Sequence, residues 1–286
     1  MNQPGKEGNH INHIINYVDM PLFCPEKIID CSTWAGNWAF YYLKYGKLEL
    51  LKERLEKYNI VKAYVSPIET ILEQEPMRAN VSLFEKIDKI NSLTIGRHKS
   101  RYFSPVPVID LSFNNWEEII DLSVKRNDVK IVKLMPNYHM YDLTEENLEK
   151  LVSYTMKHNL IISIQIRIED ARRHHPLMKV KDVDIIKTVK VLSQFPQQKF
   201  IISNGYLNDV QQALYYLDNA YADISSAETQ DVLSLLSEKY NAERLLFSTH
   251  SAFYYPEGNV FKLAYSGLDK KSIDKVSYEN ACELGL

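Results

Sequence analysis

The densest run of ionisable side chains in this sequence follows directly on an apolar segment. Leu160–Ile168 is rich in isoleucine and contains no residue that breaks a strand, which predicts a buried β-strand. Ionisable residues then crowd together, namely Arg167, Glu169, Asp170, Arg172, Arg173, His174 and His175. An apolar strand that ends in such a cluster is typical of an α/β enzyme with its chemistry at the carboxyl end of the strand. A solvated loop with internal ion pairs is the alternative interpretation.

Polar side chains also follow the other apolar segments that we expect to be strands. They are Asp30, Ser32 and Trp34 at the first, Lys133, Tyr138 and His139 at the fourth, Gln165 at the fifth, Asn204 at the sixth, Asp223 and Ser225 at the seventh, and Thr249 and His250 at the eighth. Because parallel strands present their carboxyl ends on one face, these groups are expected to share a site.

The charges in this set point to an anionic ligand. Arg167 and Arg173 each carry a guanidinium fork that can bind a carboxylate or a phosphate, so we expect a small anionic molecule as the partner. The ligand-binding set predicted here consists of Arg167, Arg173, His175, Gln165, Tyr138 and Trp34. An internal pair of Arg167 with Asp170 or Glu169 is the alternative. Of the adjacent His174 and His175, only one is expected to face inward.

Four residues of this set are candidates for a part in catalysis: His250, Asp170, Lys133 and Asn204. His250 could act as a general base near neutral pH, and Lys133 or Asn204 could stabilise an oxyanion. Asp170 could be an acid, a base or a partner for arginine, depending on its burial and neighbours. The structural alternatives are a loop histidine at 250 and a lysine that only holds the end of the sheet at 133.

The order of the elements predicts the fold. Strands are expected at Lys27–Thr33, Val61–Val65, Tyr102–Ile109, Val129–Leu134, Leu160–Ile168, Lys199–Ser203, Tyr221–Ser225 and Arg244–Ser248. Helices are expected between them at Leu48–Tyr58, Asn80–Ile90, Trp116–Val124, after a Thr144 cap, and at Asp182–Leu192, Asp209–Leu217 and Val232–Tyr240, with two C-terminal helices, the second at Ser272–Leu284. Alternating strands and helices mean a parallel sheet, and this number of units favours a (β/α)8 TIM barrel over a doubly wound open sheet.

Composition limits the class of protein. The chain has 286 residues, a net charge of −3 and three cysteines without a pairing pattern. The charge argues against a nucleic-acid or anionic-membrane binder, and the cysteines argue against a disulfide framework or a cysteine-rich zinc site. We expect an N-terminal arm at 1–25, one barrel domain at 26–286 and a cytoplasmic location, because no signal peptide or membrane span is evident. Association into a homo-oligomer is left open.

Several segments resemble the amidohydrolase superfamily, in particular its aminocarboxymuconate-semialdehyde decarboxylase-like branch. They are IIDCSTWAG at Ile28–Gly36, VKIVKLMPNYHMYDL at Val129–Leu143, LLFSTHSAFYYP at Leu245–Pro256 and YENACELGL at Tyr278–Leu286. The resemblance extends from Lys27 to Leu286 and implies a distorted (β/α)8 barrel.

The metal ligands that this resemblance implies are replaced. The His-x-His pair of the first strand falls on Ser32 and Trp34, and the later histidines fall on Gln165 and Asn204. The aspartate of the eighth strand, which in that family activates the metal-bound water, falls on Thr249 or His250. A zinc ion needs about three nitrogen, sulfur or carboxylate ligands, so we expect no cofactor and no metal ligand at these positions.

Three hypotheses of different class follow from these observations. The chain is a hydrolase or lyase that acts on a small anionic substrate without the usual divalent metal, and this is the interpretation we favour. A pseudoenzyme that binds a ligand or a partner is the second. The third is a hydrolase with a relocated metal site built from Asp170, His174 or His175, and His250.

Overall fold

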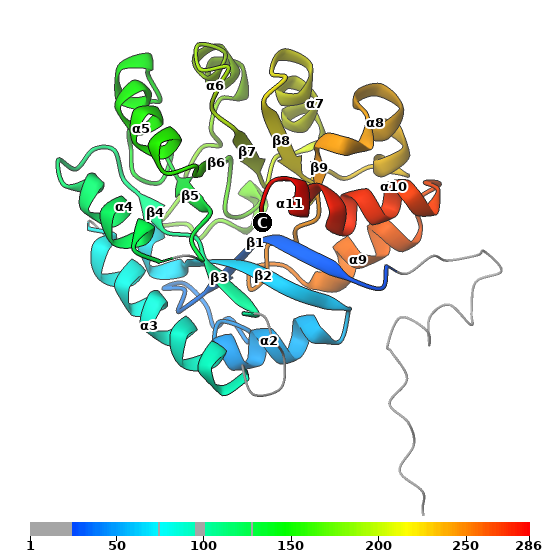
Figure 1. Ribbon diagram of the computed structural model, residues 1–286, viewed down its shortest axis with the longest axis horizontal. Helices are drawn as coiled ribbons and strands as arrows, with labels where there is room; N and C mark the ends of the chain where they lie inside the picture. The colour runs from blue at the N-terminus through cyan, green and yellow to red at the C-terminus, as the bar shows by residue number, and fades with distance from the viewer. Residues whose placement is uncertain (1–24, 74, 95–100, 127) are drawn as a thin grey trace, which may run out of the picture.

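The structure, a computed structural model, describes residues 25–73, 75–94, 101–126 and 128–286. All of the expected N-terminal arm except Pro25 lies outside these residues. Parallel strands form a ring in the centre of the molecule, and helices surround them (Figure 1). None of the described helices has both the length and the apolar character that crossing a membrane requires.

The strands confirm the TIM-barrel prediction and its distortion. They are β1 (Ile28–Ala35), β2 (Ile60–Pro67), β3 (Phe103–Pro105), β4 (Val108–Ile109), β5 (Ile131–Leu134), β6 (Ile161–Gln165), β7 (Phe200–Ser203), β8 (Ala220–Asp223) and β9 (Leu245–Leu246). Every paired neighbour is parallel, in the orders β1-β2-β3 and β4-β5-β6-β7-β8-β9. The ring therefore consists of two arcs whose edges are not joined by a regular ladder.

At one of these breaks our prediction of a single strand at Tyr102–Ile109 was wrong. The chain there forms β3 and β4, which belong to different arcs. Pro105 and Pro107 have no N–H group, so an unbroken ladder cannot form through them. The Val106 amide donates instead to the Val65 carbonyl in the first arc (2.7 Å). The Pro107 carbonyl accepts from the backbone amide of Lys133 in the second arc (2.9 Å). The two short strands together take the place of the third barrel strand.

At the other break, isolated hydrogen bonds connect β1 with the segment that follows β9. The Cys31 amide donates to the Phe247 carbonyl, and the His250 amide donates to the Ser32 carbonyl, both at 3.0 Å. These bonds hold the first and last strands side by side. They place Ser32 and His250 next to each other, although the two residues are 218 positions apart in the sequence.

The helices also follow the predicted order. They are α2 (Leu48–Glu56), α3 (Met77–Thr94), α4 (Trp116–Val124), α5 (Glu145–Lys157), α6 (Ile185–Leu192), α7 (Leu207–Tyr216), α8 (Val232–Tyr240), α9 (Pro256–Ala264), α10 (Lys270–Asp274) and α11 (Asn280–Glu283). Short turns lie at η1 (Ile68–Ile71), η2 (Ala171–Arg173), η3 (Ala242–Arg244) and η4 (Lys275–Glu279), the last being a π-helical segment. The segments α10, η4 and α11 follow one another without a break, so the chain is helical from Lys270 to Glu283, and our prediction of a helix at Ser272–Leu284 is confirmed apart from the π turn within it.

The capping prediction for α5 is confirmed. The Thr144 hydroxyl accepts from the Asn147 amide (3.2 Å), and the Asn147 side chain accepts from the Thr144 amide (2.9 Å). The spacing of Leu148, Leu151, Val152 and Met156 predicts one buried stripe along this helix, but Met156 is 49 % exposed. Thr155 is buried in its place, and its hydroxyl donates to the Leu151 carbonyl (3.0 Å), so the stripe passes one position earlier in the helix.

The barrel interior is apolar at the amino ends of the strands and polar towards the carboxyl ends. The apolar layer is made by Ile29, Cys31, Tyr64, Val106, Ile131, Ile161, Ile201 and Leu246, and Ala281 and Leu284 of the C-terminal segment pack against it. In Figure 1, α11 lies across this end of the barrel. The C-terminal segment therefore closes the amino end of the barrel, which leaves the opposite end for a site.

Two asparagines of α3 hydrogen-bond to the backbone where the barrel is split. The Asn80 amide group donates to the Val108 carbonyl (2.8 Å), and its oxygen accepts from the Val108 amide (2.9 Å). Asn91 makes the same pair of bonds with Phe103, at 2.9 and 3.3 Å. These side chains supply the partners that a continuous ladder would otherwise provide.

We expect Asn80→Ala to lower the free energy of unfolding by roughly 2–4 kcal/mol, because it leaves both buried polar groups of Val108 without this partner. Urea denaturation followed by circular dichroism measures the change. Lys89→Ala, at an exposed position of the same helix, is the control and should change the value by less than about 0.5 kcal/mol. A loss of similar size in both variants would contradict the role given to Asn80.

Candidate functional site

A buried lysine lies at the centre of the polar half of the barrel. Lys133 on β5 is 1 % exposed, and its ammonium nitrogen donates to the Ser32 hydroxyl on β1 at 2.9 Å. The same nitrogen lies 4.3 Å from the centre of the Trp34 ring. Lys133 therefore connects β5 with β1, and the face of the Trp34 ring covers its side-chain nitrogen.

Two buried carboxyl groups accompany this lysine. Asp30 on β1 accepts from the Ser32 and Thr249 amides (3.2 and 3.1 Å) and from the Thr249 hydroxyl (2.5 Å). Asp223 on β8 accepts from the Asn204 amide (3.1 Å) and from Ser225. Both aspartates are fully buried, and their hydrogen bonds connect the carboxyl ends of β1, β7, β8 and β9.

Burial shifts the pKa values of Lys133 and Asp30 towards neutrality. Desolvation lowers the pKa of Lys133 to about 7, although the charges of Asp223 and Asp30 oppose the shift. Desolvation likewise raises the pKa of Asp30 to about 7, against the bonds from Thr249 and Ser32. An amine and a carboxyl group that both titrate near neutral pH in one buried site can exchange protons with a substrate.

His250 is held neutral and has both ring nitrogens occupied. Its Nδ1 accepts from the Trp34 indole N–H (3.2 Å), and its Nε2 lies 2.8 Å from the Ile168 carbonyl. Asn204 Nδ2 is 3.3 Å from the same Nε2. Desolvation and the charge of Lys133 lower the pKa of His250 to about 3. The structure thus favours the alternative of a histidine bonded in its loop, and a role as general base would require Trp34 to move.

Unpartnered oxygen atoms face the same interior. The Gln165 amide group donates to the Arg167 carbonyl (2.6 Å), while its Oε1 has no partner among the described residues. The Ser66 hydroxyl on β2 is likewise buried without a partner in the described chain. The hydroxyls of Ser163 and Ser203 lie 2.9 Å apart. A polar ligand or water would satisfy these oxygens, since buried polar groups in native proteins are normally paired.

An apolar cluster covers this polar interior at the carboxyl end. It is made by Trp34, Trp38, Ile68, Ile71, Val108, Met135, Ile168 and Phe253, with Phe40, Tyr41, Tyr138 and Tyr254 packed against it. The Trp34 and Phe253 rings meet edge to face, with centroids 6.0 Å apart. The aromatic residues that follow β1 therefore cap the barrel mouth, and Tyr138, which we predicted to bind the ligand, belongs to this cap rather than to the polar site.

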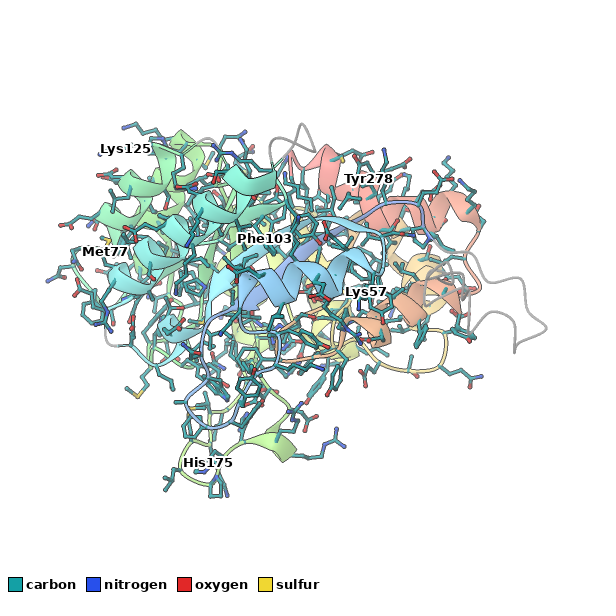
Figure 2. The ribbon with its side chains drawn as sticks, turned by 90° about the horizontal axis from the view of Figure 1, so that it is seen from below. Lys57, Met77, Phe103, Lys125, His175 and Tyr278 are labelled. Carbon is teal, nitrogen blue, oxygen red and sulfur yellow. The ribbon has the colours of Figure 1, made fainter. Side chains whose placement is uncertain are left out.

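Two loops meet above the cap. The Phe40 ring, after β1, stacks on the His175 ring, after β6, at 4.8 Å. The Tyr41 hydroxyl donates to Glu169, and Arg173 donates to the same hydroxyl (3.3 Å). Figure 2 shows His175 at the far end of a segment that projects from the body of the molecule. We call residues 36–47 and 167–184 the lid loops, because they close over the site together.

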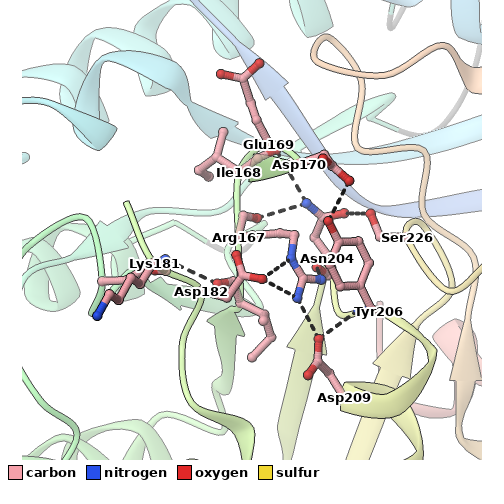
Figure 3. Close-up of polar contacts among 12 residues, drawn as sticks. Arg167, Ile168, Glu169, Asp170, Lys181, Asp182, Asn204, Tyr206, Asp209 and Ser226 are labelled. Carbon is pink, nitrogen blue, oxygen red and sulfur yellow. Dashed lines mark hydrogen bonds and ion pairs between the residues drawn. The ribbon is translucent and has the colours of Figure 1, made fainter. Parts of the chain in front are cut away.

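Arg167 is fully engaged by the protein. Its Nε donates to Asp182 (2.9 Å), one terminal nitrogen donates to Asp209 (2.7 Å) and the other to the Asn204 carbonyl (2.8 Å). The Tyr206 ring covers the guanidinium at 3.4 Å (Figure 3). The structure therefore favours an internal pair for Arg167 over a free anion-binding fork. The sequence analysis missed Asp182 and Asp209 as the carboxylates of this pair.

The remaining predicted residues of the charged loop lie outside the barrel interior. Asp170 pairs with Arg172 and accepts from the Tyr206 hydroxyl (2.7 Å), and these bonds hold the pKa of Asp170 well below its usual range. The Arg173 side chain is 51 % exposed. Together with His175, these residues belong to the lid loops. Asp170 is thus not placed to act as an acid or base at Lys133, since it stays ionised and faces the surface.

Of the predicted site residues, the barrel interior brings together Lys133, Gln165, Asn204, Trp34 and His250. A cavity of about 580 Å³ lies at the carboxyl ends of β1 and β2 and between α2 and α3, and none of these five residues lines it. Its lining includes Gly36, Glu69, Arg78 and Lys86. This cavity is separate from the interior at Lys133, which the apolar cap covers.

Comparisons with known proteins place the fold. No protein-family model and no curated protein matches the sequence. Among solved structures, 2,6-dihydroxybenzoate decarboxylase from Rhizobium matches with a TM-score of 0.66 and 11 % identity over 91 % of this chain and 98 % of that one. A candidate amidohydrolase from Staphylococcus aureus matches with a TM-score of 0.65 and 13 % identity over 91 % and 100 %. The chain therefore shares the TIM-barrel fold of these structures.

A third match bears on the cofactor. 5-Carboxyvanillate decarboxylase from Novosphingobium aromaticivorans, complexed with manganese and 4-hydroxy-3-methoxy-5-nitrobenzoic acid, has a TM-score of 0.67 and 8 % identity over 91 % of this chain and 96 % of that one. Our expectation that this fold works here without a cofactor is contradicted by that finding, which points to a metal in the active site of amidohydrolase-type neighbours.

The side chains described at the strand ends do not fit such an ion as they stand. No group of three or more histidine, cysteine, aspartate or glutamate residues in the described part of the chain could hold a metal ion. The Trp34 indole offers no ligand atom, and Lys133 Nζ already donates to Ser32. We therefore assign no metal ligand among these residues.

We expect Arg167→Met to lower the free energy of unfolding by about 3–5 kcal/mol, because it leaves Asp182 and Asp209 without their cation in a largely buried setting. Denaturant titration measures the loss. Arg173→Met is the matched control and should cost less than about 1 kcal/mol, because half of its side chain is exposed, its contact with Glu169 is long (4.0 Å) and Glu169 keeps its bond from Tyr41. Equal stability of the two variants would show that Arg167 does not anchor the loop.

We also expect Lys133→Met to change how stability depends on pH. The unfolded lysine titrates near 10.5 and the folded one near 7, so between these values the unfolded state binds more protons. The free energy of unfolding of the wild type should therefore rise with pH in this window, by on the order of a few kcal/mol.

Lys133→Met removes this contribution, so the difference in free energy between wild type and variant should depend on pH from 7 to 10.5. Denaturant titrations at four pH values in this window test it, with Lys179→Met at an exposed position as the control. A difference that stays constant across the window would refute the neutral, buried state of Lys133.

Proposed function

We propose that the chain is an amidohydrolase-type lyase or hydrolase that acts on a small carboxylate, with its site around Lys133. One observation carries this proposal. Lys133 is a buried amine at the carboxyl end of a barrel strand, and its side chain is paired with a hydroxyl rather than with a carboxylate. Lysine is almost never fully buried without a partner charge, so such a position is typical of a functional group.

An anionic substrate would supply what this site lacks. A carboxylate in this interior would supply a counter-charge for a positive nitrogen at Lys133, which no described carboxylate supplies within ion-pair distance. The unpartnered Gln165 and Ser66 oxygens face the same interior and could accept from hydroxyl groups of the substrate. The interior thus suits a small molecule with one acidic and one or more hydroxyl or oxo groups.

A lyase reaction is the better supported of the two. The neighbours in the fold include two decarboxylases of hydroxylated or methoxylated aromatic acids, and loss of CO2 leaves electron density that an adjacent cation stabilises. Asp30, with a pKa of about 7, can return a proton to the carbon that loses CO2. In this scheme Lys133 stabilises the negative charge that develops as CO2 leaves, and Asp30 donates the proton to the carbon.

Access to the site requires the lid loops to separate. The Phe40–His175 stack and the contacts of Tyr41 with Glu169 and Arg173 are the bonds that would break. Arg167 is not among them, because its bonds to Asp182 and Asp209 lie at the base of one loop. Opening can therefore leave that base in place, as in other enzymes whose loops close over substrate.

The test is an assay of CO2 release from a panel of small hydroxybenzoates and oxo acids, with manganese added because a neighbour in the fold carries it. We expect turnover of at least one acid and a loss of about a hundredfold in Lys133→Met, the size typical for removal of one stabilising group. Lys262→Met, at a second lysine with a lowered pKa, should stay within threefold of the wild type.

The binding of each acid is measured in parallel by calorimetry. If no acid binds, or if one binds and turns over equally well in wild type and Lys133→Met, the proposed function is wrong. Binding that depends on Lys133 without any release of CO2 would rule out the lyase reaction and favour the pseudoenzyme hypothesis.

A further inference from the structure

The contacts of Lys133 show what state its amine can adopt. Among the described residues, Nζ has one hydrogen-bond partner, the Ser32 hydroxyl at 2.9 Å, and no carboxylate lies within the 4.0 Å of an ion pair. An ammonium group has three hydrogens to donate, whereas a neutral amine has two and keeps a lone pair. A buried lysine with a single hydroxyl partner is better suited to the neutral form, because desolvation disfavours the charge.

A second partly buried lysine provides a contrast. Lys262 on α9 donates to the carbonyls of Ile224 (2.6 Å) and Ser225 (3.4 Å). Its nitrogen therefore binds backbone oxygens that favour the charged form, and its position is outside the barrel interior. Lys133, by comparison, lies inside the barrel beside the indole of Trp34. The two side chains share a chemical group but differ in the freedom of the nitrogen lone pair.

We propose that Lys133 is a nucleophile that forms an imine with the substrate, so that the substrate class of this site is a small oxo acid. This inference rests on the proposed function, since it uses the same site and the same carboxylate-bearing substrate. Lysines that are desolvated in an apolar pocket are activated for attack on carbonyl groups in this way. The apolar cap of Trp34, Trp38 and Phe253 supplies such surroundings.

The condensation balances with groups of the site. The Nζ lone pair forms a bond to the carbonyl carbon, and the carbonyl π electrons move to oxygen. That oxygen leaves as water, with one proton from the amine and one from an acid, for which the carboxyl group of Asp30 is available in the same interior. The Ser32 hydroxyl, which already bonds to Nζ, can relay the amine proton. The product is a protonated imine that keeps one N–H.

The imine also explains how a lyase reaction could proceed here. When the carboxylate lies on the carbon next to the imine carbon, the electrons of the breaking bond to CO2 flow into the protonated imine and give an enamine. A proton then returns to that carbon, and water releases the ketone and regenerates the amine. No oxidant or reductant is needed. The positive imine nitrogen stabilises the charge that develops as CO2 leaves.

Borohydride trapping tests this chemistry on the intact chain. Wild-type protein is incubated with acetoacetate or pyruvate and reduced with sodium borohydride, which adds hydride across C=N and fixes the imine as a secondary amine. Intact mass measurement and peptide mapping locate the product. We expect one adduct per chain, on the peptide that contains Lys133. Propionate, an acid of similar size without a carbonyl group, should give no adduct.

Variants decide whether the label is specific. We expect Lys133→Met and Lys133→Arg to lose at least nine-tenths of the label, and Lys262→Met to keep it. Circular dichroism shows whether each variant is folded, and the mapping of the wild type does not depend on the variants. Label spread over surface lysines, or no label on folded wild type, overturns the imine.

Failure of the imine proposal can be distinguished from failure of the proposed function. Turnover of a hydroxybenzoate that requires Lys133, without any trapped adduct from an oxo acid, would leave the lyase proposal standing and overturn the imine alone. A trapped adduct at Lys133 together with release of CO2 from acetoacetate supports both.

Discussion

The burial of charge inside the barrel is the constraint on which the rest of this structure depends. Lys133, Asp30 and Asp223 lie where most barrels of this size are filled by branched apolar side chains. Moving these groups out of water costs several kcal/mol each unless they are paired or neutralised. The pKa values of Lys133 and Asp30 approach neutrality for this reason, and the hydroxyls of Ser32 and Thr249 provide bonds that suit either protonation state.

Such an interior must be sealed, and two layers do so from opposite ends. The C-terminal segment packs on the apolar layer at the amino ends of the strands, with Ala281 and Leu284 in contact with it. The aromatic cap covers the carboxyl ends, and the lid loops lie over the cap. Arg167 fixes the base of one loop through Asp182 and Asp209. Strong bonds thus lie at the base of the lid, while its tip is held by stacking and by exposed polar contacts.

Local patterns in the sequence are sufficient to predict most of this fold. The bounds of α4 and α8 are those expected from helical periodicity, and the alternation of strands and helices predicts the barrel. Pro105 and Pro107 indicate that the third strand is interrupted, but not that its two halves pair in different arcs. That division depends on the neighbouring strands. The resemblance of short segments also predicted a distorted barrel, and the solved structures that match the chain share this fold.

The site was harder to predict from the sequence, because its decisive contacts join residues that are far apart in the chain. Arg167 finds its carboxylates 15 and 42 positions away, rather than in the neighbouring Glu169 or Asp170. His250 is bonded to Trp34, 216 positions earlier, which removes the free nitrogen that a general base needs. A histidine or an arginine at a strand end shows where chemistry could occur, whereas only the packed structure shows whether its nitrogen atoms are free.

Trp34 connects the cap to the chemistry beneath it. Its ring lies over Lys133 Nζ and packs against Phe253 of the cap, and its indole N–H donates to His250. A movement of the cap that displaced this indole would take the aromatic face from Lys133 and the donor from His250 in one step. His250 would then regain a nitrogen able to accept a proton, and Lys133 would face the incoming substrate. Opening of the site and exposure of its reactive groups are therefore one event, because one side chain holds both closed.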